Sequence, residues 1–214
     1  MTGLVRYTSP IEGPQGLAWD GSLLWVTSAR NGRLYAVDLP TWSVRNEFVP
    51  PYEALGLTCV GSDFRLVLAP TIEDSDLERD HRYVYSFAPD AGFVQCFPCP
   101  GFSGSFLAYS DGMLYLSQAW DKKLITLDAH GAATHETPLE RRPVGMTIVD
   151  GAFYVATVGD DWNDGLLQRF SVTGDASTIE TLRAFPFKPR SVAFDGERFW
   201  TADRDNDAIV SFTV

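Results

Sequence analysis

The sequence contains little of what several common protein classes require. It has only three cysteines and three histidines among its 214 residues. Three cysteines are too few for a disulfide framework and favour a reducing compartment, so we expect a cytoplasmic protein. No apolar run approaches the roughly 18 residues of a membrane helix, and residues 1–10 lack the basic and apolar regions of a signal peptide. A signal peptide that has been removed is the alternative left open.

Basic residues are scarce relative to acidic ones. The chain has 17 Lys and Arg residues against 28 Asp and Glu residues, which gives a net charge of −11. Affinity for nucleic acid depends largely on Lys and Arg that neutralise phosphates, and an anionic membrane selects for the same residues. We therefore expect neither a nucleic acid nor a membrane as partner. Solubility is the simplest explanation of the acidity.

Motifs of familiar enzyme classes are also missing. The sequence contains no Gly-x-Ser-x-Gly, no phosphate-binding glycine loop and no His-Glu-x-x-His. Cys96 and Cys99 form a lone Cys-x-x-Cys in an expected strand, where residues three apart point to opposite faces. Zinc would need two further ligands. Function therefore has to be inferred from the fold and from where it places charged and aromatic residues.

What the sequence does contain is a fivefold repeat. A short apolar segment that ends in glycine recurs five times, with final glycines Gly21, Gly61, Gly112, Gly151 and Gly196. Their spacings of 40, 51, 39 and 45 residues are typical of propeller blades with four short strands each. Counting from Gly196 past the C-terminus and back to Gly21 adds a further 39 residues, so the repeats form a closed set. A β-sandwich with accidental spacing would not explain this closure.

Each repeat predicts one antiparallel blade. In four repeats an Asp-Gly pair separates two apolar segments, which predicts a hairpin with positive φ at both turn residues. We expect one all-β domain, 1–214, folded as a five-bladed β-propeller with blades at about 16–50, 56–100, 105–139, 145–185 and 191–214. The last repeat has only three strands, so residues 4–10 are expected to supply its outer strand. This closure removes an exposed sheet edge.

The strand order brings two sets of loops to one end of the ring: those that join successive blades, and those between the second and third strands. These loops are longer and more polar than the turns at the other end, and binding groups concentrate on such loops. Many of their side chains are carboxylates, which could bind a divalent cation or a cationic ligand, or could simply face solvent. We expect the functional site at this end.

Candidate site residues follow from this placement. Arg30, Arg142 and Arg190 could bind an anionic group on a substrate, and the loop tryptophans Trp120 and Trp162 could line a pocket. The alternatives are ion pairs with acidic loops for the arginines and core packing for the tryptophans. If the site is catalytic, carboxylate general-base chemistry is expected, with anion stabilisation by arginine or a metal. The candidate catalytic residues are Glu12, Glu53 and Asp203.

Two segments resemble a known superfamily. Glu12-Gly13-Pro14 before Gly16, and the segment 191–203, resemble blades of the calcium-dependent-phosphotriesterase superfamily, which includes the SMP-30/gluconolactonase, NHL-repeat and virginiamycin-lyase-like propellers. In gluconolactonase-like members the matching Glu and an Asp at the end of a second strand bind metal. The resemblance thus implies Glu12 and Asp203 as ligands of Ca²⁺ or Mg²⁺. The Asn ligand of those enzymes has no counterpart here.

A weaker resemblance links the chain to plant-type glutaminyl cyclotransferases, which are five-bladed. It rests on Gln15-Gly16-Leu17 and on Glu53-x-x-Gly56-Leu57-Thr58. Their acidic motif on the second strand of the first blade is replaced by residues 24–28. Two hypotheses result: a small-molecule-binding protein, as a hydrolase or lyase-type enzyme if it is catalytic, or a non-catalytic scaffold that presents loop 70–82 to a protein partner.

Overall fold

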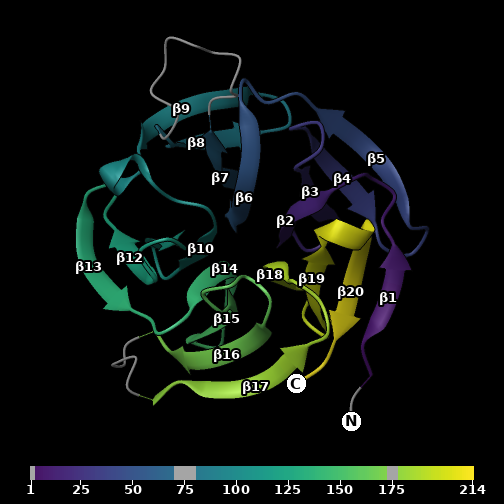
Figure 1. The fold of residues 1–214 in the computed structure, drawn as a ribbon. Coiled ribbons are helices and arrows are strands. Elements are labelled where there is room, and N and C mark those ends of the chain that lie inside the picture. The colour runs from purple at the N-terminus through teal and green to yellow at the C-terminus, as the bar shows by residue number, and fades with distance from the viewer. Residues whose placement is uncertain (1–2, 70–80, 173–177) are drawn as a thin grey trace.

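The computed structural model describes residues 3–69, 81–172 and 178–214. The chain forms five four-stranded antiparallel sheets arranged as blades around a central axis (Figure 1). No α-helix occurs in these three ranges, and two short 3₁₀ segments of three residues each lie within them. The predicted all-β, five-bladed propeller is confirmed.

The strands of each blade run from the axis outward in chain order, with one exception in the last blade. Blade 1 consists of β2 (Pro14–Trp19), β3 (Leu24–Ser28), β4 (Leu34–Asp38) and β5 (Ser43–Phe48). Blade 2 consists of β6 (Glu53–Val60), β7 (Asp63–Ala69), β8 (Tyr83–Ala88) and β9 (Gly92–Pro98). Blade 3 follows the 3₁₀ turn η1 (Pro100–Phe102) and consists of β10 (Leu107–Ser110), β11 (Met113–Gln118), β12 (Lys123–Leu127) and β13 (Ala133–Pro138).

Blade 4 consists of β14 (Arg142–Val149), β15 (Ala152–Val158), β16 (Gly165–Ser171) and β17 (Glu180–Phe185). Blade 5 consists of β18 (Arg190–Phe194), β19 (Phe199–Asp203), β20 (Ala208–Phe212) and the N-terminal β1 (Val5–Thr8). The 3₁₀ turn η3 (Arg204–Asn206) lies between β19 and β20.

The N-terminal strand closes the ring, as predicted. β1 pairs antiparallel with β20, from Val5 opposite Ser211 to Thr8 opposite Ala208, and the two termini lie close together in Figure 1. The Tyr7 ring packs 4.9 Å from Trp42 of blade 1. Trp42 Nε1 also donates a hydrogen bond to Thr8 O. β1 therefore ties the last blade to the first.

The core is built between blades. Five clusters of buried apolar side chains are present, and each is formed chiefly by two neighbouring blades. Glycines let the innermost strands approach closely: a Cβ at Gly145 would lie 2.2 Å from Ser191 Cα, and one at Gly56 would lie 2.5 Å from Phe106 Cα. Each blade thus depends on its neighbours for burial of its apolar surface.

The Asp-Gly turns take two forms, so the prediction for them is only partly right. In blades 3 and 4 both turn residues have positive φ, as at Asp111 and Gly112. In blades 1 and 5 only the glycine does. There the aspartate binds its own loop instead: Asp20 Oδ1 accepts from the Ser22 and Leu23 amides, and Asp20 Oδ2 accepts from Trp25 Nε1 at 2.6 Å. The aspartate side chain replaces a tight backbone turn because it can satisfy those amides itself.

Candidate functional site

A pocket of about 180 Å³ lies at the end of the ring where the functional site was predicted, and we call it the mouth pocket. Three of the predicted binding residues, Trp120, Trp162 and Arg190, line it together. Two arginines that the sequence did not single out, Arg82 and Arg204, line it as well. The remaining lining residues are Gln15, Leu55, Ser105, Phe106, Ala119 and Val144. No carboxylate belongs to this described lining, although the chain carries a net charge of −11.

Arg82 and Arg204 are held in place by neighbouring blades. Arg82 Nη1 donates to Gly104 O at 2.6 Å and to Ser105 Oγ at 3.1 Å. Arg204 Nη1 donates to Gln15 Oε1 at 2.8 Å. These hydrogen-bond partners are neutral and orient the two guanidinium groups. Carboxylates also lie near them: Arg204 Nε is 3.9 Å from Asp205 Oδ1, and the Glu53 carboxyl interacts electrostatically with both arginines. The lining residues themselves carry three guanidinium charges and no carboxylate.

The third pocket arginine, Arg190, has a lowered pKa. Burial and the nearby Arg204 charge lower the pKa of Arg190 to about 10, while Asp205 acts in the opposite direction. Its Nη1 donates to Pro189 O at 3.2 Å, and its guanidinium carbon lies 5.9 Å from the centre of the Trp162 ring. The group remains a cation at neutral pH. An anion in the pocket would offset both its loss of hydration and the repulsion from Arg204.

The two tryptophans form one side of the pocket. Their ring centroids are 5.0 Å apart with an interplanar angle of 63°. The Arg142 guanidinium carbon lies 5.1 Å from the Trp120 ring and 5.2 Å from the Trp162 ring, within the range of cation–π attraction. Arg142 also pairs with Asp160 at 3.2 Å. Arg142, predicted to bind substrate, is therefore placed to hold the tryptophans and does not itself line the pocket.

Trp162 has an unusual backbone conformation. Its φ is +63°, a left-handed conformation that bulky residues adopt only under constraint. The turn is closed by the Trp162 amide, which donates to Gly159 O at 3.1 Å. Such strain is found preferentially at functional sites.

Among the predicted carboxylates, Glu53 interacts electrostatically with the pocket residues Arg82 and Arg204. It begins β6, two residues before the pocket residue Leu55, and is half-buried. Burial raises the pKa of the Glu53 carboxyl, and the charges of Arg82 and Arg204 partly oppose this. A half-buried carboxyl with a raised pKa that interacts with guanidinium groups is a candidate for proton transfer.

The other predicted residues lie elsewhere. Glu12 is exposed, and its backbone carbonyl accepts a hydrogen bond from Ser28 Oγ. Asp203 is fully buried and accepts from Arg6 Nη1 of the closing strand at 2.5 Å and from Asn206 Nδ2 at 3.0 Å. Arg30 is exposed and lies 3.8 Å from Asp207. None of the three lines the mouth pocket.

The residues present at the mouth do not fit a divalent cation. In the described ranges no three His, Cys, Asp or Glu side chains are grouped so that they could hold a metal ion. Asp203 already has a cationic partner, and the pocket is lined by guanidinium groups that would repel a cation. The acidic residues between 70 and 80, which were part of the loop predicted for a protein partner, lie outside the described residues.

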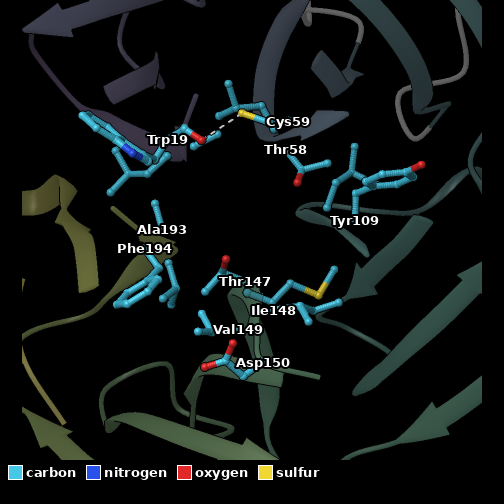
Figure 2. A pocket seen from close by; sticks show the side chains of 16 residues that line it. Trp19, Thr58, Cys59, Tyr109, Thr147, Ile148, Val149, Asp150, Ala193 and Phe194 are labelled. Atoms are coloured by element: carbon cyan, nitrogen blue, oxygen red, sulfur yellow. Dashed lines mark hydrogen bonds between the residues drawn. The ribbon is translucent and has the colours of Figure 1, made fainter. Parts of the chain in front are cut away.

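A second cavity, of about 380 Å³, is lined in part by residues next to the Asp-Gly turns, at the opposite end of the ring. Figure 2 shows this cavity from close by. The inner strands of all five blades line it, with Thr58 and Thr147 among the polar side chains and Asp150 at its edge (Figure 2). Cys59 Sγ donates to Trp19 O at 3.1 Å, and burial raises the pKa of this thiol to about 12. Cys59 is therefore a protonated thiol without nucleophilic character at neutral pH. This larger cavity has no group of convergent charges among its lining residues.

No protein-family model matches this sequence, and no curated protein matches it. Solved structures do share its fold. Glutaminyl cyclase from Myxococcus xanthus aligns with a TM-score of 0.69 at 13% identity, over 99% of this chain and 95% of that one. Virginiamycin B lyase from Staphylococcus aureus aligns with a TM-score of 0.58 at 14% identity over the whole of both chains. The calcium-binding protein regucalcin from Agrobacterium tumefaciens aligns with a TM-score of 0.60 at 14% identity, over 97% of this chain and 92% of that one.

These similarities agree with the predicted resemblance at the level of the fold. The identities are too low to carry over any activity or ligand. In the described ranges, no helix is long and apolar enough to cross a membrane.

Proposed function

We propose that this chain binds a small anionic molecule in the mouth pocket. The observation that carries the proposal is the lining itself: three arginines from blades 2 and 5 and no carboxylate among the described lining residues. Guanidinium groups bind carboxylates and phosphates through paired hydrogen bonds. An acidic protein that concentrates arginines around one pocket gains little stability from doing so, because the like charges repel each other. A bound anion would offset that repulsion.

We propose as a second step that the site is catalytic, with Glu53 as the proton-transferring group of a hydrolase or lyase-type reaction. The support is the raised pKa of the half-buried Glu53 carboxyl and its electrostatic interaction with Arg82 and Arg204. The same guanidinium groups could stabilise negative charge that develops on a substrate. The lyase and the cyclase that share this fold are enzymes, which supports the class without naming a reaction. Glu12, Asp203 and Arg30 are not part of this proposal.

The decisive experiment compares two changes to the protein. A panel of small organic anions is screened by thermal shift and calorimetry against the wild type, an Arg190→Ala/Arg204→Ala variant and a variant lacking residues 73–80. The double substitution should abolish the stabilisation by an anion, and the deletion should leave it intact. If the deletion alone removes binding, the pocket is not the site and the protein-scaffold hypothesis for loop 70–82 takes its place.

We also propose that the protein acts in the cytoplasm with neither a nucleic acid nor a membrane as partner. The net charge of −11 supports the second part. The first part is supported by Cys59, Cys96 and Cys99, which are all free thiols.

A further inference from the structure

We infer that the ligand of the mouth pocket is an aromatic carboxylate, with its carboxylate on the arginines and its ring on Trp120. This inference rests on the function proposed above and narrows the ligand class. The inference follows from the lining residues: the arginines come from blades 2 and 5, and the tryptophans come from blades 3 and 4.

One side of the pocket provides charge and hydrogen bonds. Arg204 of blade 5 is joined to Gln15 of blade 1, and Arg82 of blade 2 is joined to Ser105 of blade 3. Arg190 lies beside Arg204, whose charge contributes to its lowered pKa. The hydrogen bonds of Arg82 and Arg204, and the ion pair of Arg204 Nε with Asp205 at 3.9 Å, occupy only part of each guanidinium, which has five N–H donors. The remaining donors suit a group that accepts several hydrogen bonds at once, as a carboxylate does.

The other side of the pocket is aromatic and apolar. It is formed by Trp120 of blade 3 and Trp162 of blade 4, and the apolar residues Phe106, Ala119 and Val144 also belong to the lining. Trp120 is 64% exposed, so most of its surface is free although Trp162 and Arg142 contact it. Packing of the core does not require a tryptophan at this exposed loop position, and an exposed tryptophan at a pocket is typical of a ligand-contact position. A flat ring is the group that it binds most favourably.

The size of the pocket limits the ligand to a small one. About 180 Å³ is below the range of about 300–1,000 Å³ of drug-sized sites. A single ring with one carboxylate is consistent with this space. An inorganic anion would leave the aromatic side of the pocket uncovered, and a neutral aromatic compound would place no negative charge among the three guanidinium groups.

Benzoate is the probe for the test, and three compounds serve as comparisons. Benzamide keeps the ring and removes the charge, acetate keeps the carboxylate and removes the ring, and phosphate is an inorganic anion. Binding is measured by calorimetry and by quenching of tryptophan fluorescence. We expect benzoate to bind more tightly than each of the others. A ring contact is expected to give benzoate roughly a 2- to 10-fold advantage over acetate.

Three variants assign the effect to residues. Arg204→Gln should weaken benzoate binding roughly 10- to 100-fold, because a charged hydrogen bond is lost. Trp120→Ala should remove the advantage of benzoate over acetate, and Trp120→Phe should restore part of it. Arg45→Gln removes one positive charge from the outer strand β5, whose Arg45 pairs with Asp38, and should leave binding unchanged.

The outcomes separate this inference from the proposed function. If acetate or phosphate binds as tightly as benzoate and Trp120→Ala has no effect, the pocket is an anion site without aromatic selectivity, and only this inference is overturned. If benzamide binds as tightly as benzoate and Arg204→Gln has no effect, the anion site itself is wrong. If no probe binds while the protein is folded, the inference of an aromatic carboxylate is overturned.

Discussion

At the scale of single residues, neighbours in the sequence have different surroundings. Asp203 ends β19, pairs with Arg6 of the closing strand and accepts a hydrogen bond from the Asn206 side-chain amide, whereas Arg204 lines the mouth pocket. Asp203 therefore serves the closure of the ring. Its resemblance to a metal ligand of gluconolactonase-like propellers is one of position along the strand, and the pairing with Arg6 gives it a different environment.

The Arg6–Asp203 ion pair predicts a stability effect. Arg6→Ala should lower the free energy of unfolding by roughly 1–3 kcal/mol, because it leaves a buried carboxylate without its cationic partner. Arg45→Ala, which breaks an exposed pair with Asp38, should cost less than about 1 kcal/mol. Urea denaturation of both variants and the wild type measures the difference. Equal losses in the two variants would contradict a structural role for the buried pair.

Glu53 predicts a pH effect with a definite sign. Its pKa is raised above the usual 4.5, chiefly by burial, so the protonated form is favoured in the folded state. The contribution of this pKa shift to the free energy of unfolding is fully present below pH 4.5, the unperturbed pKa. It is lost as the pH rises through the pKa that Glu53 has in the folded protein. Relative to a Glu53→Gln variant, the wild type should therefore become less stable over this rise in pH. Denaturant midpoints measured from pH 4 to pH 8 in both proteins test this, and a constant difference would exclude Glu53 as a perturbed acid.

At the scale of elements, the two kinds of Asp-Gly turn respond differently to the same substitution. Asp20→Asn should cost about 1 kcal/mol, because the bond from Trp25 Nε1 to the carboxylate is weakened. Asp111→Asn should change stability by less than about 0.5 kcal/mol, since Asn tolerates the φ of +51° found there. Thermal melts of the two variants are the measurement. A larger loss for Asp111→Asn would show that the turn types are wrongly assigned.

The closing strand is the element on which the ring depends most directly. Deletion of residues 1–9 removes β1 and exposes the β20 edge, together with the faces of Trp42 and Trp200 that Tyr7 covers. We expect a large fall in melting temperature and aggregation, because an unpaired edge is a template for association. Deletion of residues 1–3, which lie before β1, is the control. Size-exclusion chromatography and a thermal melt read out both effects, and an unchanged monomer without β1 would contradict closure by this strand.

At the scale of the whole molecule, the charge of the mouth pocket lining is opposite in sign to the net charge of the chain. The chain has a net charge of −11, yet the described lining of its mouth pocket is cationic. A cationic pocket predicts the outcome of metal addition after EDTA treatment. A specific site at about 100 times its dissociation constant adds about 2.7 kcal/mol, equal to roughly 5–11 °C for a chain of this size. We expect no such shift with Ca²⁺, Mg²⁺, Mn²⁺ or Zn²⁺. A shift of that size with one ion would show that the protein binds a metal after all.

The fold could be predicted far more completely than the site. Strand positions follow from local apolar runs and turn residues, and the blade number follows from counting them. For the site, the sequence led to Trp120, Trp162 and Arg190 because they lie in loops at the end of the ring where the mouth pocket is found. It missed Arg82 and Arg204, which lie in loops so rich in carboxylates that they were expected to be acidic. Loop composition does not reveal which side chain turns toward the axis.

By itself, the sequence determined the five blades and the closure by the N-terminal strand, because spacing and alternating apolar residues are enough to specify hairpins and their number. Only the tertiary structure decided the character of the mouth. Arg82, Arg190 and Arg204 meet there through contacts between different blades, while Asp203 is turned away by its ion pair with Arg6. Charge at a pocket depends on side-chain direction and on partners distant in the chain, and neither is encoded in a local repeat.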